Sequence, residues 1–238
     1  MNLITEMKSP LKGTPHLCQP DGQKGCALCC GLFNLADIGK KNLAAFLRKG
    51  KTRSLKSALG GAYWTGRKGP DLRDRETYLC PFQGFACKNR PGCMVHPAVS
   101  GSEGRNRSLY GLELCRDYLC PAYSLLDNDL KHFMVLYIDD WYLYSTAIAD
   151  PLSFRWLADL LMGTIGRVER VKENEALIKK ALSAALTIHA AYLAARETPV
   201  FYHGVSEYLL NRDDFSLDKP GQADHAENIK RALDRLLL

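Results

Sequence analysis

All nine cysteines of this chain lie in its first 120 residues, and they constrain the fold more than any other feature. Cys26-Ala-Leu-Cys29 has the C-x-x-C spacing, from which two thiolates can bind one metal ion within a single turn. Cys80, Cys87 and Cys93 follow 50 residues later, so the pattern predicts a composite metal site drawn from distant segments. The full set is Cys18, Cys26, Cys29, Cys30, Cys80, Cys87, Cys93, Cys115 and Cys120.

The surroundings of these cysteines favour metal ligation over disulfides. The opening MNLITEMKSPLKG lacks the basic flank and apolar stretch of a secretory signal, so we expect a cytoplasmic protein, where thiols stay reduced. A thioredoxin-type C-x-x-C should lie between a strand and a helix, and that setting is absent here. For Cys115 and Cys120, near several leucines, packing as small buried hydrophobes is an equal alternative.

Composition divides the chain at Cys120. Residues 1–120 hold 15 of the 19 glycines and carry a net charge of +10, whereas residues 121–238 carry −4 and no cysteine. So many turns leave little continuous apolar surface before residue 120, and metal binding is expected to replace it. We therefore predict a mainly α protein: a cysteine-rich metal-binding region at 1–120, irregular and metal-organised, and a helical region at 121–238.

Hydrophobic spacing predicts several helices. Phe133, Tyr137, Trp141, Tyr144 and Ile148 fall on one helical face, and Asp150-Pro151 supplies an N-cap and first-turn proline for the next helix. An alanine-rich helix is expected over 167–196, with His189 as a satisfied core or boundary residue. In the first half, a helix is expected over 37–49, ended by Gly50.

The ordered cysteine motifs resemble a known family. Cys26-Ala-Leu-Cys29-Cys30-Gly31, then Cys80-Pro81-Phe82, Cys87 and Arg90-Pro91-Gly92-Cys93 are similar to the CxxCxxCC family of zinc- or iron-chelating proteins, the YkgJ-like proteins. The resemblance spans about 100 residues, from Cys18 to Cys120. One residue separates Pro91 from Cys93 where the family has two, and the chain has nine cysteines against the usual eight.

The resemblance implies a metal site more than an activity. The implied ligands are Cys26, Cys29, Cys30, Cys80, Cys87 and Cys93, with Cys18, Cys115 and Cys120 as further members. Related motifs in flagellin lysine methylases imply iron–sulfur chemistry, and with it an enzyme as one alternative. The cofactor expected from the residues is a [4Fe–4S] cluster or zinc, because four thiolates suit both. Apart from the resemblance, Cys93-Met-Val-His96 has chelating spacing, so His96 is a candidate nitrogen ligand; His16 is another candidate, but a surface histidine is the preferred interpretation there.

A basic segment offers a second kind of function. Between Lys40 and Arg75 there are 11 basic residues and two acidic ones, with Tyr63 and Trp64 among them. Such a segment can bind nucleic-acid phosphates and stack bases, although a solvated charged face is the commoner use. No run of about 18 apolar residues is present, so no membrane partner is expected. No nucleotide-binding or hydrolase motif identifies a substrate.

Overall fold

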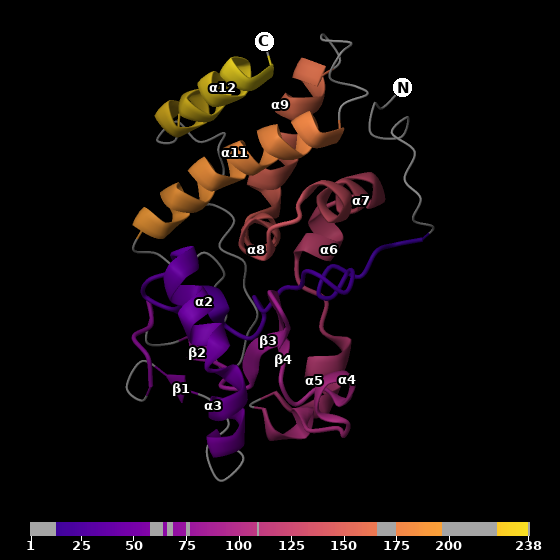
Figure 1. Cartoon of the computed structure of the whole chain (residues 1–238), viewed down its shortest axis with the longest axis vertical. Coiled ribbons are helices and arrows are strands. Elements are labelled where there is room, and N and C mark those ends of the chain that lie inside the picture. The colour runs from indigo at the N-terminus through magenta and orange to yellow at the C-terminus, as the bar shows by residue number, and fades with distance from the viewer. Residues whose placement is uncertain are drawn as a thin grey trace.

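The computed structural model confirms a mainly helical fold. It describes residues 13–57, 64–65, 69–74, 77–108, 110–165, 175–196 and 223–237. The larger helices lie at one end of the molecule and the short strands at the other (Figure 1). In the described part of the chain, no helix is long and apolar enough to cross a membrane. The helices after Cys120 are α6 (Ala122–Leu125), α7 (Asn128–Tyr137), α8 (Trp141–Ala149), α9 (Pro151–Ile165), α11 (Glu175–Ala195) and α12 (Ala223–Leu237).

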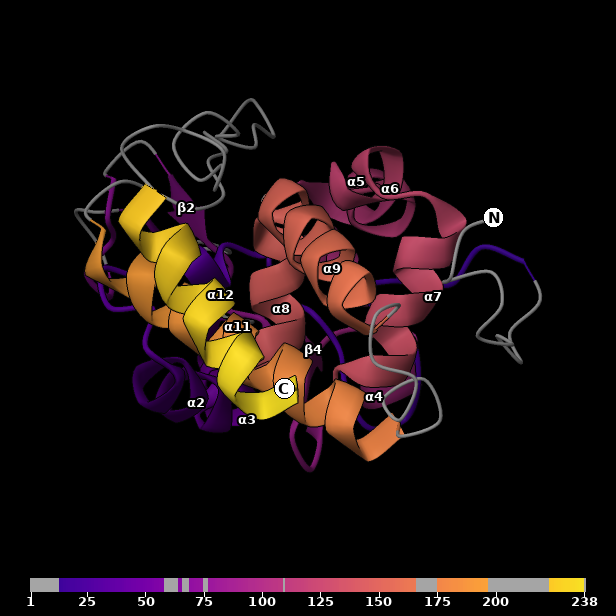
Figure 2. The same ribbon diagram turned by 90° about the horizontal axis from the view of Figure 1, so that it is seen from above.

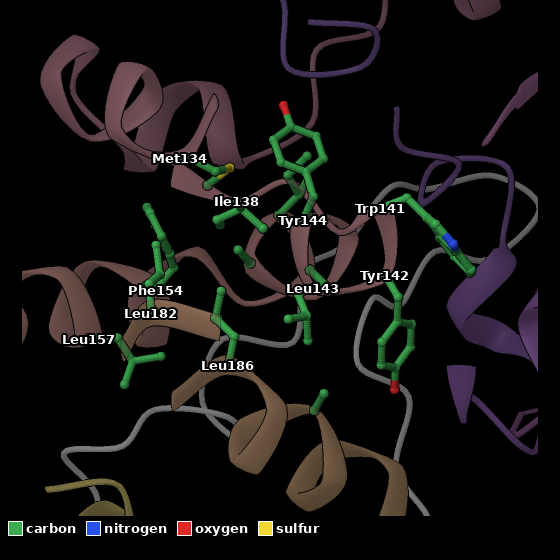
Figure 3. Close-up of a cluster of buried hydrophobic side chains, with 14 of the residues drawn as sticks. Met134, Ile138, Trp141, Tyr142, Leu143, Tyr144, Phe154, Leu157, Leu182 and Leu186 are labelled. Carbon is green, nitrogen blue, oxygen red and sulfur yellow. The ribbon is translucent and has the colours of Figure 1, made fainter. Parts of the chain in front are cut away.

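Helix α8 forms the centre of the molecule. All nine of its residues are buried, as expected of a helix enclosed by others on every side. Its buried hydroxyls are satisfied within the helix: Ser145 donates to the Trp141 carbonyl at 2.8 Å, and Thr146 to that of Tyr142 at 2.9 Å. Figure 3 shows its apolar side chains between those of α7, α9 and α11.

The start of α9 and the buried face of α11 follow the sequence prediction. The Asp150 carboxylate accepts a hydrogen bond from the Ser153 backbone N–H at 3.1 Å, so it caps α9 ahead of Pro151. Ile178, Leu182 and Leu186 are fully buried along α11. Residues 167–174 of the expected helix, and with them its predicted start, lie outside the described residues. Helix α12 packs beside α11, as both views show (Figures 1 and 2).

The aromatic stripe from Phe133 to Ile148 is not one continuous helix. Helix α7 ends at Tyr137, and Asp140 begins α8 by accepting hydrogen bonds from the N–H groups of Tyr142 and Leu143 at 3.0 and 3.2 Å. Four of its five side chains are nevertheless buried and Tyr137 is half-buried, because both helices face the same core. The spacing therefore predicted correctly that these side chains face the core. The prediction of a single helical face was wrong, because Asp140 caps the start of a new helix.

Gly50 also has a role different from the one expected. Helix α2 (Lys40–Arg48) ends before it, but Gly50 begins α3 (Gly50–Ser57) instead of leading into a loop. A Cβ at Gly50 would lie 2.4 Å from the Gly84 Cα on strand β3. The glycine is thus needed for the close approach of two backbones, and it does not stop the helical course of the chain.

Two short antiparallel strand pairs lie near the middle cysteines: Cys80 directly follows the first pair, and Cys87 and Cys93 end the strands of the second. Strand β1 (Trp64–Thr65) pairs with β2 (Tyr78–Leu79), and β3 (Gln83–Cys87) pairs with β4 (Arg90–Cys93). In the second hairpin Gln83 lies opposite Cys93, with an irregularity in the register before Cys87. Two further helices, α4 (Pro97–Ser100) and α5 (Gly111–Asp117), follow on the same side of the molecule, together with the 3-10 turns Leu32–Asn34 and Arg105–Arg107.

The first 120 residues contribute fully to the hydrophobic core. Leu17, Leu28, Phe33 and Leu43 are at most 1% exposed and belong to the same buried cluster as the helices after Cys120. The expectation that this region has little apolar core is therefore wrong. Its apolar residues are scattered between turns rather than periodic, so they come together only in three dimensions. The boundary between two regions at Cys120 stays a prediction.

A buried hydrogen-bonded chain joins three helices at the upper end of the molecule. His189 on α11, 1% exposed, bonds the Asp150 carboxylate through Nε2 at 3.1 Å and His225 Nε2 on α12 through Nδ1 at 3.3 Å. Because a carboxylate only accepts, His189 donates to it from Nε2. Tyr192 stacks on His225, with ring centroids 4.0 Å apart. His189 is thus the satisfied core histidine that the sequence predicted.

This histidine chain predicts a loss of stability as the pH falls from 6.5 toward 4. Burial, and then the neighbouring His189, lower the pKa of His225 from 6.5 to about 4. In that range the unfolded chain binds a proton at His225 that the folded chain does not, so acid favours unfolding. Because the ring is only half-buried, we expect a loss of roughly 1–2 kcal/mol.

Urea unfolding at pH 7 and pH 4.5 checks this prediction. The wild type should lose more stability on acidification than His225→Phe, which keeps an aromatic ring against Tyr192 and has nothing to titrate. Equal pH dependence in the two proteins would contradict it.

Candidate metal centre

Four cysteines from three segments of the chain line one cavity. They are Cys18, Cys26, Cys29 and Cys120, which we call the first thiol group. Leu17, Leu28, Tyr118 and Ile148 complete the lining, so the surroundings of the sulfurs are largely apolar. Cys120 is 90 or more residues from the other three in sequence, and the fold alone brings it to them.

A compact turn holds the C-x-x-C pair of this group. The Cys26 N–H donates to the Cys18 carbonyl at 2.9 Å, and the Leu28 N–H lies 3.3 Å from the Cys26 sulfur. Gly31 closes the turn with a backbone φ of +83°, and its N–H donates to the Leu28 carbonyl at 2.8 Å. An N–H aimed at a cysteine sulfur is a favourable partner for a thiolate.

Helices from the C-terminal half fix the segment that carries Cys18. The Leu17 N–H donates to the Tyr123 hydroxyl of α6 at 2.7 Å, and the Tyr144 hydroxyl of α8 donates to the Leu17 carbonyl at 2.8 Å. Figure 3 shows the Tyr144 hydroxyl pointing away from α11. On its other side the segment contacts the β3–β4 hairpin, where Gln19 Nε2 donates to the Pro91 carbonyl at 2.8 Å. The segment is therefore held between the helices and the hairpin.

Burial keeps the first thiol group protonated in the metal-free protein. It raises the pKa of Cys18 and of Cys120 to about 12, and neighbouring thiols add to the effect. Burial raises the pKa of Cys26 well above 9, and a hydrogen bond with Cys30 together with burial does the same for Cys29. A metal ion must therefore displace protons to bind here, as is general for thiolate ligands.

A second set of cysteines lies beside the first. Cys30, Cys80, Cys93 and Cys115 form what we call the second thiol group. The thiols of Cys29 and Cys80 are near enough to the Cys30 thiol to influence its pKa, which is raised well above 9. Cys30, Cys80 and Cys93 belong to one small apolar cluster. Burial raises the pKa of Cys93, and the thiols of Cys115 and of Cys29 in the first group add to this effect, so the two groups are in electrostatic contact.

The remaining candidate ligands lie apart from both groups. Cys87, at the end of β3, is exposed, and its thiol donates to the Gly22 carbonyl at 3.3 Å. His96 caps α4, with its Nδ1 accepting from the Ala98 N–H at 3.1 Å, and His16 is exposed. In the described residues, no three Cys, His, Asp or Glu side chains are so arranged that they could hold a metal ion as they lie.

Sequence reasoning did not find the partners of the C-x-x-C turn. Cys120 was expected either to pack or to bind metal, and nothing in the spacing linked it to Cys18 and Cys26. Tyr144, which bonds Leu17, was interpreted only as an apolar position on a helical face, and Tyr123 was not singled out. The one available signal was the Cys120-Pro121 dipeptide, which occurs also as Cys80-Pro81 and says nothing about a partner.

Two arginines of the basic segment, Arg53 and Arg73, form hydrogen bonds within the fold. Arg53 donates to the carbonyls of Phe46 and of Gln83, the latter at 2.7 Å, and lies over the Phe46 ring. Arg73 donates to the Leu193 and Ala194 carbonyls at the end of α11, at 3.2 and 3.0 Å. Residues 58–63, 66–68 and 75–76 lie outside the described residues, so nucleic-acid binding through Lys40 to Arg75 stays a prediction.

Comparison with known proteins gives no relative for this chain. No family model matches its sequence, no curated protein matches it, and no solved structure matches its fold. The resemblance to the CxxCxxCC family therefore stays a prediction that rests on the motifs themselves.

Proposed function

We propose that this protein binds a metal through cysteine thiolates at the cavity lined by the first thiol group, as an iron–sulfur cluster or a zinc ion. One observation carries the proposal: Cys18, Cys26, Cys29 and Cys120 come from three separate segments and line the same cavity. The fold thus brings four sulfur donors from separate segments to one place, where a single ion or cluster could take all of them. Four thiolates are the usual donor set of both a structural zinc site and a [4Fe–4S] cluster.

The donor set suits the group although the sulfurs as they lie do not enclose an ion. Each cysteine has one side-chain torsion with three staggered wells, so its sulfur can turn toward a common centre while the backbone stays in place. The apolar lining excludes water and strengthens the attraction between thiolates and a cation. The Leu28 N–H beside the Cys26 sulfur supports the charged form of that ligand.

Bound metal would stabilise the loop-rich part of the chain. It would join the segment around Cys18, the C-x-x-C turn and the start of α6, and so close loops that otherwise depend on packing alone. A zinc ion supplies such a cross-link, whereas an iron–sulfur cluster also supplies electron transfer or sensing. The helices contribute by orienting the ligand segments through Tyr123 and Tyr144.

The test is metal content after anaerobic purification. We expect wild-type protein to carry bound zinc or iron, measured by elemental analysis, with inorganic sulfide and brown absorption if the metal is a cluster. Cys26→Ser should lose that metal. The matched control is Cys87→Ser, because Cys87 is exposed and lies outside the first thiol group.

Two outcomes separate function from folding. Cys26→Ser that is metal-poor and keeps the wild-type circular dichroism spectrum supports the proposal. A folded wild-type protein that takes up neither zinc nor iron with sulfide during reconstitution contradicts it. So does a Cys26→Ser variant that keeps the full metal content.

A further inference from the structure

The second thiol group is built into the fold as closely as the first. The Cys80 N–H donates to the Cys30 carbonyl at 2.9 Å, so the two ligand-bearing backbones are directly paired. Gln83, fully buried, donates from Nε2 to the carbonyls of both Cys30 and Cys80 at 3.0 Å each. One amide side chain therefore holds the two segments in register. Cys93 lies opposite Gln83 in the β3–β4 hairpin.

Apolar side chains pack around three cysteines of this group. Tyr78, Phe82 and Val95 are at most 3% exposed and pack with Cys80, while Cys30 and Cys93 contact the same cluster. Cys115 on α5 is exposed, and its thiol lies 3.0 Å from the Ser108 hydroxyl. Cys30 also contacts the main core, so it lies at the boundary between the two environments.

Two arginines lie near the second group. Arg105 is paired with Glu103, with Nη2 and Oε2 2.6 Å apart, and it is near enough to Cys93 and Cys115 to interact electrostatically with both. Arg53 lies near Cys80. Four thiolates around a divalent metal or a [4Fe–4S] cluster leave net negative charge, which a nearby guanidinium stabilises. Burial lowers the pKa of Arg53 to about 10, so it is still charged at neutral pH.

We infer that Cys30, Cys80, Cys93 and Cys115 hold a second metal centre, so that the adjacent cysteines Cys29 and Cys30 serve different centres. The inference rests on the proposed function and extends it from one site to two. It accounts for eight of the nine cysteines as two sets of four and leaves Cys87 outside both. The ligand class is the same as at the first centre, namely zinc or a thiolate-bound iron–sulfur cluster.

Metal stoichiometry tests this inference. The full chain is purified anaerobically and reconstituted with zinc alone or with ferrous iron and sulfide, and the metal per chain is measured. We expect Cys80→Ser to hold half the wild-type metal, Cys26→Ser to hold the other half, and the double variant to hold none. Cys93→Ser repeats the Cys80 test at a half-buried position, where serine is better tolerated. Cys87→Ser, in the same hairpin, should match the wild type.

Each result has a distinct meaning. Wild-type metal content in both Cys80→Ser and Cys93→Ser, with Cys26→Ser empty, overturns the second centre and leaves the proposed function standing. Complete loss in Cys26→Ser and also in Cys80→Ser, with wild-type circular dichroism, indicates one shared centre and likewise overturns it. A wild type that binds no metal overturns both proposals.

Discussion

Replacing Gly31 by alanine is expected to destabilise the protein by about 2–5 kcal/mol. The left-handed backbone at Gly31, with φ +83°, costs an alanine about 1–2 kcal/mol. Its Cβ would also lie 2.2 Å from the Tyr78 carbonyl oxygen, which accepts a hydrogen bond from Asn34 and cannot withdraw freely. Such a clash adds about 1–3 kcal/mol. The free energy of unfolding in urea measures the total.

Gly101 provides a matched control for this prediction. It has nearly the same backbone conformation, with φ +78°, but a Cβ there would meet nothing within 4 Å. Gly101→Ala should therefore cost only the conformational part, about 1–2 kcal/mol. Equal losses in the two variants would show that the packing of Gly31 against Tyr78 is not as described. Because Gly31 follows Cys30 directly, Gly31→Ala should also lower metal content.

Asp150→Ala is expected to cost about 2–4 kcal/mol. The carboxylate is 5% exposed and bonds both the Ser153 N–H and His189. Loss of the helix cap accounts for about 1 kcal/mol. Loss of the acceptor also leaves a donor nitrogen of His189 buried without a partner, which adds about 1–3 kcal/mol. Thermal or urea unfolding at pH 7 gives the value.

Asp127 separates the two contributions. It caps α7 through the Leu130 N–H at 2.8 Å, but it is exposed and no buried histidine depends on it. Asp127→Ala should cost only about 1 kcal/mol. If Asp150→Ala costs no more than this control, the chain from Asp150 to His225 contributes nothing to stability.

Local signals in the sequence predicted the helical half well. Asp150-Pro151 specifies a helix start by itself, and the spacing of Ile178, Leu182 and Leu186 specifies a buried face whatever the neighbours are. The break between α7 and α8 at Asp140 was missed because the spacing of apolar residues indicates only which side chains are buried. Two successive helices that face the same core keep the same spacing as one continuous helix. Gly50 was misread because its requirement comes from Gly84, a residue 34 positions away.

The sequence predicted that cysteines form the candidate site, but it did not predict which cysteines come together. The C-x-x-C turn identifies itself, since its two cysteines are neighbours in sequence. The association of Cys120 with Cys18 depends on hydrogen bonds from Tyr123 and Tyr144 to Leu17, and no spacing rule reports these. Cys87 illustrates the converse case. Its place in an ordered motif suggested a ligand, whereas the irregular register at the end of β3 leaves it facing Gly22.

The hydroxyl groups that hold Leu17 connect the helices after Cys120 to the segment that carries Cys18. Tyr123 accepts from the Leu17 N–H, and Tyr144 donates to the Leu17 carbonyl. A chain shortened after Cys120 would keep all nine cysteines but lose both hydroxyls, so a full set of thiols does not by itself fix the position of Cys18.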